Sequence, residues 1–130
     1  MICKVFSMYR FEIWFIFLGI FLPRRASKNK YNDVEDEHMG TNMLLTASET
    51  FDHVELKSRI GTLDQQTSSH GFSSFKFVPD TKESIVVALK SEEYQGKIDS
   101  YIMVFKYSDG TIIVPETYIG NSKYEGIEFI

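Results

Sequence analysis

Cysteine is nearly missing from this sequence, and its scarcity limits what can hold the fold together. Cys3 is the only cysteine among 130 residues, so no internal disulfide can form and no cluster of thiolates can bind a metal. A single cysteine leaves the compartment open, because β-rich secreted proteins also fold without disulfides. The fold must therefore rest on a hydrophobic core.

Positive charge is also in short supply. The chain has 14 lysines and arginines against 18 aspartates and glutamates, which gives a formal net charge of −4. This balance does not favour nucleic acids or anionic membranes by bulk electrostatics. If such an acidic chain acts on an anionic substrate, a cation is needed between the two.

The apolar runs are all too short to span a bilayer, which takes about 20 residues in a helix. The longest apolar run, Ile13–Leu22, follows Lys4 and Arg10 and so resembles the first two parts of a signal peptide. It ends at Pro23 without a small-residue cleavage site. The density of Phe, Ile and Trp favours a buried strand, and a signal or anchor segment is the alternative interpretation.

Helical periodicity is absent as well, and the sequence predicts an all-β protein. Residues 24–42 are polar and predict a long exposed loop, with an acidic cluster that we interpret as solvated surface. In Val54–Ile60, the residues Val54, Leu56 and Ile60 predict one buried face. The other expected strands are 43–47, 75–77, 84–89, 100–107, 112–114 and 124–130, with a turn at 108–110.

Turn signals recur about every 8–12 residues, as in sandwiches, barrels and propellers. A propeller blade takes about 40–45 residues, so the chain has room for two blades and a remainder. The spacing of the turns does not choose between a piece of a propeller and a small sandwich.

Several longer motifs are more specific than this periodicity. They are the segments 21–27 (FLPRRAS), 70–77 (HGFSSFKF), 85–93 (IVVALKSEE), 100–105 (SYIMVF), 114–117 (VPET) and 123–130 (KYEGIEFI). In this order and at nearly this spacing, they resemble the calcium-activated nucleotidases, a family of soluble apyrases. The resemblance covers residues 21–130.

The resemblance implies part of a five-bladed β-propeller with Ca²⁺ in its central tunnel. It also implies hydrolysis of nucleoside di- or triphosphates, with UDP and GDP preferred by vertebrate members. Those members act in the secretory pathway and are linked to proteoglycan synthesis, so the expected localisation is the secretory pathway or the cell exterior.

The family's calcium ligands correspond to Ser73 and Glu125 of this sequence. Arg24 and Arg25 lie in the family motif at 21–27, where a guanidinium could bind a diphosphate through two hydrogen bonds. Without the resemblance, these four residues would be read as ordinary strand or loop side chains. Calcium is a hard ion that takes six to eight oxygen ligands, so Ser73 and Glu125 supply only part of a coordination shell.

Other phosphate chemistry is not indicated. His70 precedes Ser73 and Ser74, but no nucleophile-elbow pattern surrounds these serines, and the sequence has no phosphate-binding loop of the Gly-x-x-x-x-Gly-Lys type. The hydrolysis would therefore rely on the metal. No catalytic residue is assigned.

The resemblance ends before Phe21. Residues 1–20 contain no motif like the family's upstream calcium glutamate, and the earlier blades are missing. We therefore expect a fragment with an incomplete metal site that hydrolyses nucleotides negligibly by itself. The alternatives are an inactive fragment that pairs its strand edges with another copy or a full-length enzyme, and an unrelated β-sandwich binding module.

Overall fold

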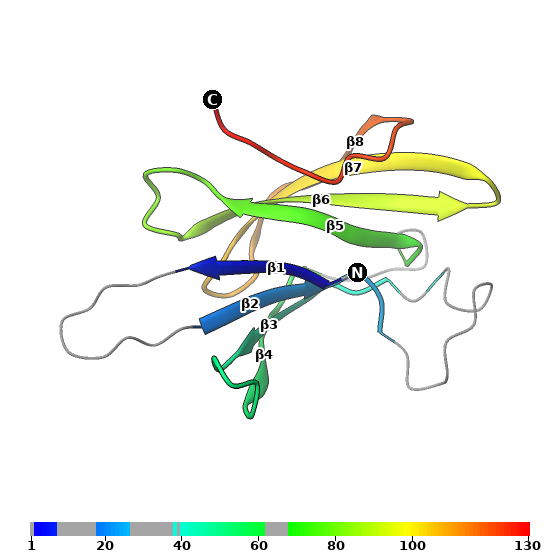
Figure 1. The fold of residues 1–130 in the computed structure, drawn as a ribbon. Coiled ribbons are helices and arrows are strands. Elements are labelled where there is room, and N and C mark those ends of the chain that lie inside the picture. Colours follow the sequence, from blue (N-terminus) through cyan, green and yellow to red (C-terminus); the bar gives the residue numbers. More distant parts are fainter. Residues whose placement is uncertain (1, 8–17, 27–37, 39, 62–67) are drawn as a thin grey trace.

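The fold consists of two four-stranded antiparallel sheets, seen one above the other in Figure 1. The computed structural model describes residues 2–7, 18–26, 38, 40–61 and 68–130. The first sheet contains β1 (Ile2–Ser7), β2 (Leu18–Pro23), β3 (Met43–Ala47) and β4 (Val54–Arg59). The second contains β5 (His70–Phe77), β6 (Ile85–Tyr94), β7 (Lys97–Lys106) and β8 (Ile112–Gly120). The prediction of an all-β protein is confirmed, and the described residues form no α-helix.

In both sheets the strands pair in chain order, so each sheet is a simple meander. Such a meander is the form that a propeller blade takes, and the pair of sheets is consistent with part of a propeller. The first strands β1 and β2 contact β5, where the two sheets meet.

The core lies between the two sheets. Its fully or nearly fully buried members are Ile20, Leu22, Leu44, Ile60, Phe72, Phe75, Val86, Ala88, Met103 and Phe105. On β6 the residues Val86 and Ala88 share one face because side chains alternate along a strand. The β-branched run at 85–87 favours this strand, and β6 confirms the strand expected at 84–89.

Gly110 brings the second sheet against the end of the first. It lies in the turn between β7 and β8 with φ of +74°, and its amide donates a hydrogen bond to the carbonyl of Lys106. A Cβ atom at this position would lie 2.2 Å from the carbonyl oxygen of Arg59 on β4. Only glycine permits this approach, so the turn predicted at 108–110 also joins the sheets.

Two sequence predictions about strands are wrong. Val54 and Leu56 do not form a buried face with Ile60, because their exposed fractions are 57% and 46%. β4 is the last strand of its sheet, so it has a neighbouring strand on one side only. The alternation correctly predicted a strand, but a strand face is buried only where another part of the protein packs against it.

The predicted strand at 124–130 is absent too. After β8 the chain has no regular structure, and Figure 1 shows the terminal segment, in red, running over the second sheet on the side away from the first. It is fastened by side chains: the Ser73 hydroxyl donates to the Tyr124 carbonyl, and Lys76 pairs with Glu128. Without a backbone partner, a β-prone segment remains extended but forms no ladder.

Two other predictions fall partly or wholly outside the described residues. β2 confirms the last part of the buried strand expected at 13–22, whereas residues 13–17 are not described. Most of the predicted loop at 24–42, including its acidic cluster, also lies outside the described part. No helix among the described residues is long and apolar enough to cross a membrane.

Candidate functional site

Three of the four predicted site residues line one pocket of about 170 Å³. The pocket is formed by Arg24, which follows β2, by Phe72 and Ser73 of β5, and by Lys123 and Glu125 of the terminal segment. These residues come from three distant parts of the sequence. Arg25 does not line this pocket, and its backbone forms an isolated bridge with Gly40.

Ser73 reaches the pocket because of a β-bulge. Phe72 pairs with Lys90 and Ser74 with Leu89, so Ser73 is the extra residue on β5. A bulge re-aims a side chain relative to its neighbours. The Ser73 hydroxyl donates a hydrogen bond of 2.9 Å to the carbonyl of Tyr124, which fixes the terminal segment beside β5 and brings Glu125 to the pocket.

Arg24 is held by residues of the second sheet. Its guanidinium donates to the Ser91 hydroxyl at 2.7 Å and to the Gly71 carbonyl at 3.2 Å, and it pairs with Glu93 at 3.3 Å. A Cβ at position 71 would lie 2.5 Å from Arg24 Cγ. The glycine of the His-Gly-Phe-Ser motif therefore makes room for the arginine of the Leu-Pro-Arg-Arg motif.

Four charged side chains at this pocket form a group that we call the rim cluster: Arg24, Glu93, Lys123 and Glu125. Lys123 Nζ lies 3.0 Å from Glu93 Oε1 and 3.1 Å from Glu125 Oε1. The hydrogen bond from Lys123 holds the pKa of Glu93 below its ordinary value, and the charges of Arg24 and Arg25 act in the same direction. The side chain of Glu125 is 52% exposed, so solvent reaches this cluster.

The oxygen atoms at the pocket fit calcium in kind. Ser73 offers a hydroxyl, Tyr124 a carbonyl and Glu125 a carboxylate, and calcium prefers such ligands. They are fewer than the six to eight that calcium takes. The described residues contain no group of three or more His, Cys, Asp or Glu side chains arranged to hold a metal. Ser73 and Glu125 would thus hold the ion only together with water or other ligands.

A second group of charges, the core cluster, lies on strands of the second sheet and was not predicted as a site. It contains His70 of β5, Lys90 and Glu92 of β6, and Glu116 of β8. Lys90 is completely buried, and its ammonium donates to Glu116 at 3.1 Å and to the Asn42 amide oxygen at 2.5 Å. It also lies 4.8 Å from the centre of the Phe72 ring, so this charge is neutralised inside the core.

His70 occupies the other side of the core cluster. Its Nδ1 lies 2.6 Å from Glu116 Oε1 and its Nε2 lies 3.5 Å from Glu92 Oε2. An ionised carboxylate can only accept, so Nδ1 donates to Glu116. The ring stacks on Tyr101 at 4.0 Å. Burial raises the pKa of Tyr101 to about 12, helped by the charge of Glu92.

Glu116 connects the two halves of the core cluster. Burial by itself would raise the pKa of its carboxyl, but the hydrogen bond from His70 and the charge of Lys90 outweigh that effect, and the pKa lies below its ordinary value. The His70 ring thus contacts two carboxylates, whereas the Ser73 hydroxyl donates to the Tyr124 carbonyl.

The alternation of side chains could have revealed the core cluster from sequence. Lys90 lies two residues after Ala88 and four after Val86, both fully buried, so it had to share their face. A lysine on a core face requires a carboxylate partner. The identity of that partner, 26 residues away on β8, depends on strand pairing that the pattern does not supply.

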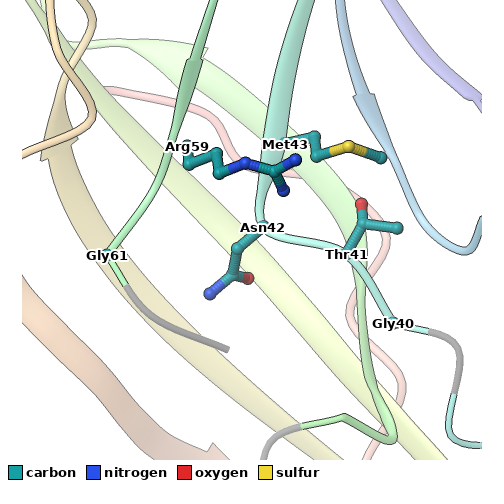
Figure 2. Close-up of a pocket in the computed structure, with 6 residues that line it drawn as sticks. All are labelled: Gly40, Thr41, Asn42, Met43, Arg59 and Gly61. Carbon is teal, nitrogen blue, oxygen red and sulfur yellow. The ribbon is translucent and has the colours of Figure 1, made fainter. Parts of the chain in front are cut away.

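Another pocket, of about 180 Å³, lies at the edge of the first sheet. Figure 2 shows Arg59, from the end of β4, reaching toward Met43 at the start of β3, with Thr41 in the segment just before it. Among the described residues that line it, Arg59 is the only charged one and none is a carboxylate. This pocket therefore cannot serve as a cation site with the described residues, and the pocket at Ser73 and Glu125 is the better candidate.

Comparison with known proteins agrees with the motifs. The family model described as Apyrase matches residues 12–130. The chain belongs to the apyrase family. It is 52% identical over 110 residues to soluble calcium-activated nucleotidase 1 of Mus musculus, covering 85% of this chain and 26% of that protein.

Two more distant apyrases support the same assignment. The chain is 43% identical to Apyrase apy-1 of Caenorhabditis elegans over 110 residues, which is 84% of this chain and 30% of that protein. It is 31% identical to an apyrase of Cimex lectularius over 121 residues, which is 93% of this chain and 31% of that protein. The chain thus spans about a quarter to a third of the length of these relatives, and an unrelated β-sandwich module is excluded.

Proposed function

We propose that this chain forms part of a calcium-dependent phosphohydrolase for nucleoside diphosphates of the UDP and GDP type. In this proposal Ser73 and Glu125 are calcium ligands, and Arg24 and Arg25 bind the substrate phosphates. The observation that carries it is the single pocket that Arg24, Ser73 and Glu125 share. Its support from relatives is the calcium-activated nucleotidase at 52% identity.

The geometry divides the work between the residues. A bound Ca²⁺ would supply positive charge that polarises phosphate oxygens. Arg24 is held by Ser91 and Gly71 at the pocket, so its positive charge is fixed beside the position proposed for an anionic group. Arg25 lies one residue further along, and its charge acts on the same Glu93. Together, the calcium ion and the two arginines would form a positively charged region that attracts an anionic substrate although the chain as a whole is acidic.

The fold that we propose for the whole enzyme is a five-bladed propeller, of which the two sheets are blades. We further propose that this enzyme acts in the secretory pathway or outside the cell, with proteoglycan synthesis as one setting. In the chain itself the metal site is incomplete. We therefore propose that residues 1–130 alone hydrolyse UDP or GDP negligibly.

The test is calcium binding by the wild-type chain and by Glu125→Gln. Tyrosine-sensitised terbium luminescence, with calcium as the competitor, reports the affinity, and released phosphate reports hydrolysis. We expect calcium to bind on the order of millimolar, Glu125→Gln to weaken binding at least about tenfold, and phosphate release from UDP to stay at background.

Glu128→Gln is the matched control, because it makes the same change three residues away in a carboxylate that pairs with Lys76 outside the pocket. Equal loss of affinity in both variants would refute the assignment of Glu125. Phosphate release by the wild-type chain at an enzymatic rate would refute its inactivity.

A second candidate function is an interaction through strand edges, and the exposed apolar side chains of β8 favour it. Ile112, Ile113, Val114, Tyr118 and Ile119 are each between 38% and 56% exposed on the last strand of the second sheet. Exposed edge strands invite pairing with another chain. We propose a homodimer or a complex with a full-length apyrase. Size-exclusion chromatography with light scattering should show self-association. A stable monomer up to about 100 μM would argue against the homodimer.

A further inference from the structure

Lys123 has no role in the proposed function, yet it lies at the centre of the rim cluster. Its ammonium bridges Glu93 Oε1 at 3.0 Å and Glu125 Oε1 at 3.1 Å. It lines the same pocket as Ser73 and Glu125. The carboxylate proposed as a calcium ligand is therefore already paired with a cation that belongs to the chain.

A divalent cation and this ammonium compete for the same carboxylate, one oxygen of which the ammonium already contacts. Calcium binds carboxylate oxygens at about 2.3–2.6 Å, and an ammonium 3.1 Å from Glu125 Oε1 uses that oxygen as its acceptor. Two cations on one carboxylate also repel each other, by an amount that depends on how much water screens them. Binding at Glu125 and pairing with Lys123 are thus opposed.

Glu93 gives Lys123 a second position. Because the ammonium contacts both carboxylates, it can leave Glu125 and remain paired with Glu93. Arg24 contacts the same Glu93 oxygen at 3.3 Å. Release of Glu125 would then leave two cationic side chains, Arg24 and Lys123, gathered on Glu93 at the rim of the pocket.

We infer that Lys123 is an internal competitor of the metal site: it holds Glu125 when no divalent cation is present and must release it for one to bind. This inference rests on the proposed assignment of Glu125. It has two consequences for the chain. The metal-free pocket keeps its carboxylate neutralised, and the affinity for calcium is lower than the oxygen ligands alone would give.

The decisive measurement is the affinity of Lys123→Gln for terbium and calcium, by the same luminescence competition. Loss of the ammonium should tighten binding roughly three- to tenfold, as expected for removing one like charge near a half-exposed carboxylate. Lys123→Arg keeps the charge and should bind within about twofold of the wild type. Lys76→Gln is the matched control, since it changes net charge equally at the pair with Glu128 outside the pocket.

The outcomes separate this inference from the site itself. If Lys123→Gln binds no tighter than Lys76→Gln while Glu125→Gln loses affinity, Lys123 is no competitor and the metal site stands. If Glu125→Gln and Glu128→Gln both bind like the wild type, the site is wrong and the inference falls with it. Lys123→Met serves as a second neutral variant, and circular dichroism verifies that each variant is folded.

Discussion

The core cluster and the rim cluster contain similar side chains in different surroundings. Glu92 and Glu93 are consecutive on β6, yet the first joins the core cluster and the second the rim cluster, because adjacent residues of a strand face opposite ways. The charge of Lys90 is fully enclosed, whereas the side chain of Lys123 is 38% exposed. The comparison shows that the residue types in a charged cluster do not reveal whether it stabilises the fold or binds a ligand; the degree of burial must be known too.

An enclosed charge must keep its partner, whereas an exposed one can exchange it. Lys90 has Glu116 and Asn42 as acceptors within the core, and their removal would leave its ammonium away from water. Lys123 has water as an alternative to both of its carboxylates. We therefore assign stability to the core cluster and ligand exchange to the rim cluster, and two predictions test that division.

The larger effect is expected from Glu116→Leu. Removing one member of a buried ion pair leaves an uncompensated charge and costs about 3–5 kcal/mol, and Lys90 is completely buried. The free energy of unfolding, from urea titrations followed by circular dichroism, should fall by this amount. The double variant Lys90→Met with Glu116→Leu should recover most of the loss, because both charges are then gone. A loss below about 1 kcal/mol in the single variant would contradict the division.

The smaller effect is the pH dependence of stability. The folded pKa of Glu116 lies below its ordinary value of 4.5, so the unfolded chain binds more protons in acid and stability rises with pH. The contribution of Glu116 is complete above the unfolded pKa and is lost as the pH falls through the folded pKa. Between pH 6 and pH 3, Glu116→Gln should therefore show a shallower decline of unfolding free energy than the wild type.

Glu93→Gln is the comparison for that profile. The pKa of Glu93 is lowered as well, chiefly by Lys123, but its side chain is 42% exposed and its interactions are screened. Its slope should stay closer to that of the wild type, most of all at high salt. If Glu93→Gln flattened the pH dependence of the unfolding free energy more than Glu116→Gln did, the rim cluster rather than the core cluster would be the one that stabilises the fold.

The sequence predicted the all-β class, and its motifs named residues that the structure brings to one pocket. Alternation and β-branched runs predicted an all-β chain, and long motifs indicated the family and the residues Arg24, Ser73 and Glu125 that share a pocket. The burial of Val54 and Leu56 and the strand at 124–130 were predicted wrongly. Both errors concern tertiary contacts, since a sequence pattern indicates the conformation that a segment favours but not which strand or layer packs beside it.

The two clusters show the same limit. Lys123 was part of the quoted motif KYEGIEFI, but its contact with Glu93 joins segments 30 residues apart. Glu116 lies in the motif VPET, and its partners His70 and Lys90 are on two other strands. The pairing of Glu116 with His70 and Lys90 depends on strand register, including the bulge at Ser73. Register cannot be derived from one sequence alone.

Gly110 has a consequence for how this fold tolerates change. With the carbonyl of Arg59 2.2 Å from where a Cβ would stand, even a methyl group there would act as a wedge, forcing the β7–β8 turn off the end of β4. Such a substitution deletes no bond and no buried surface of its own, yet it would tilt one layer against the other. The distance between the two sheets at this end therefore depends on Gly110 having no Cβ atom.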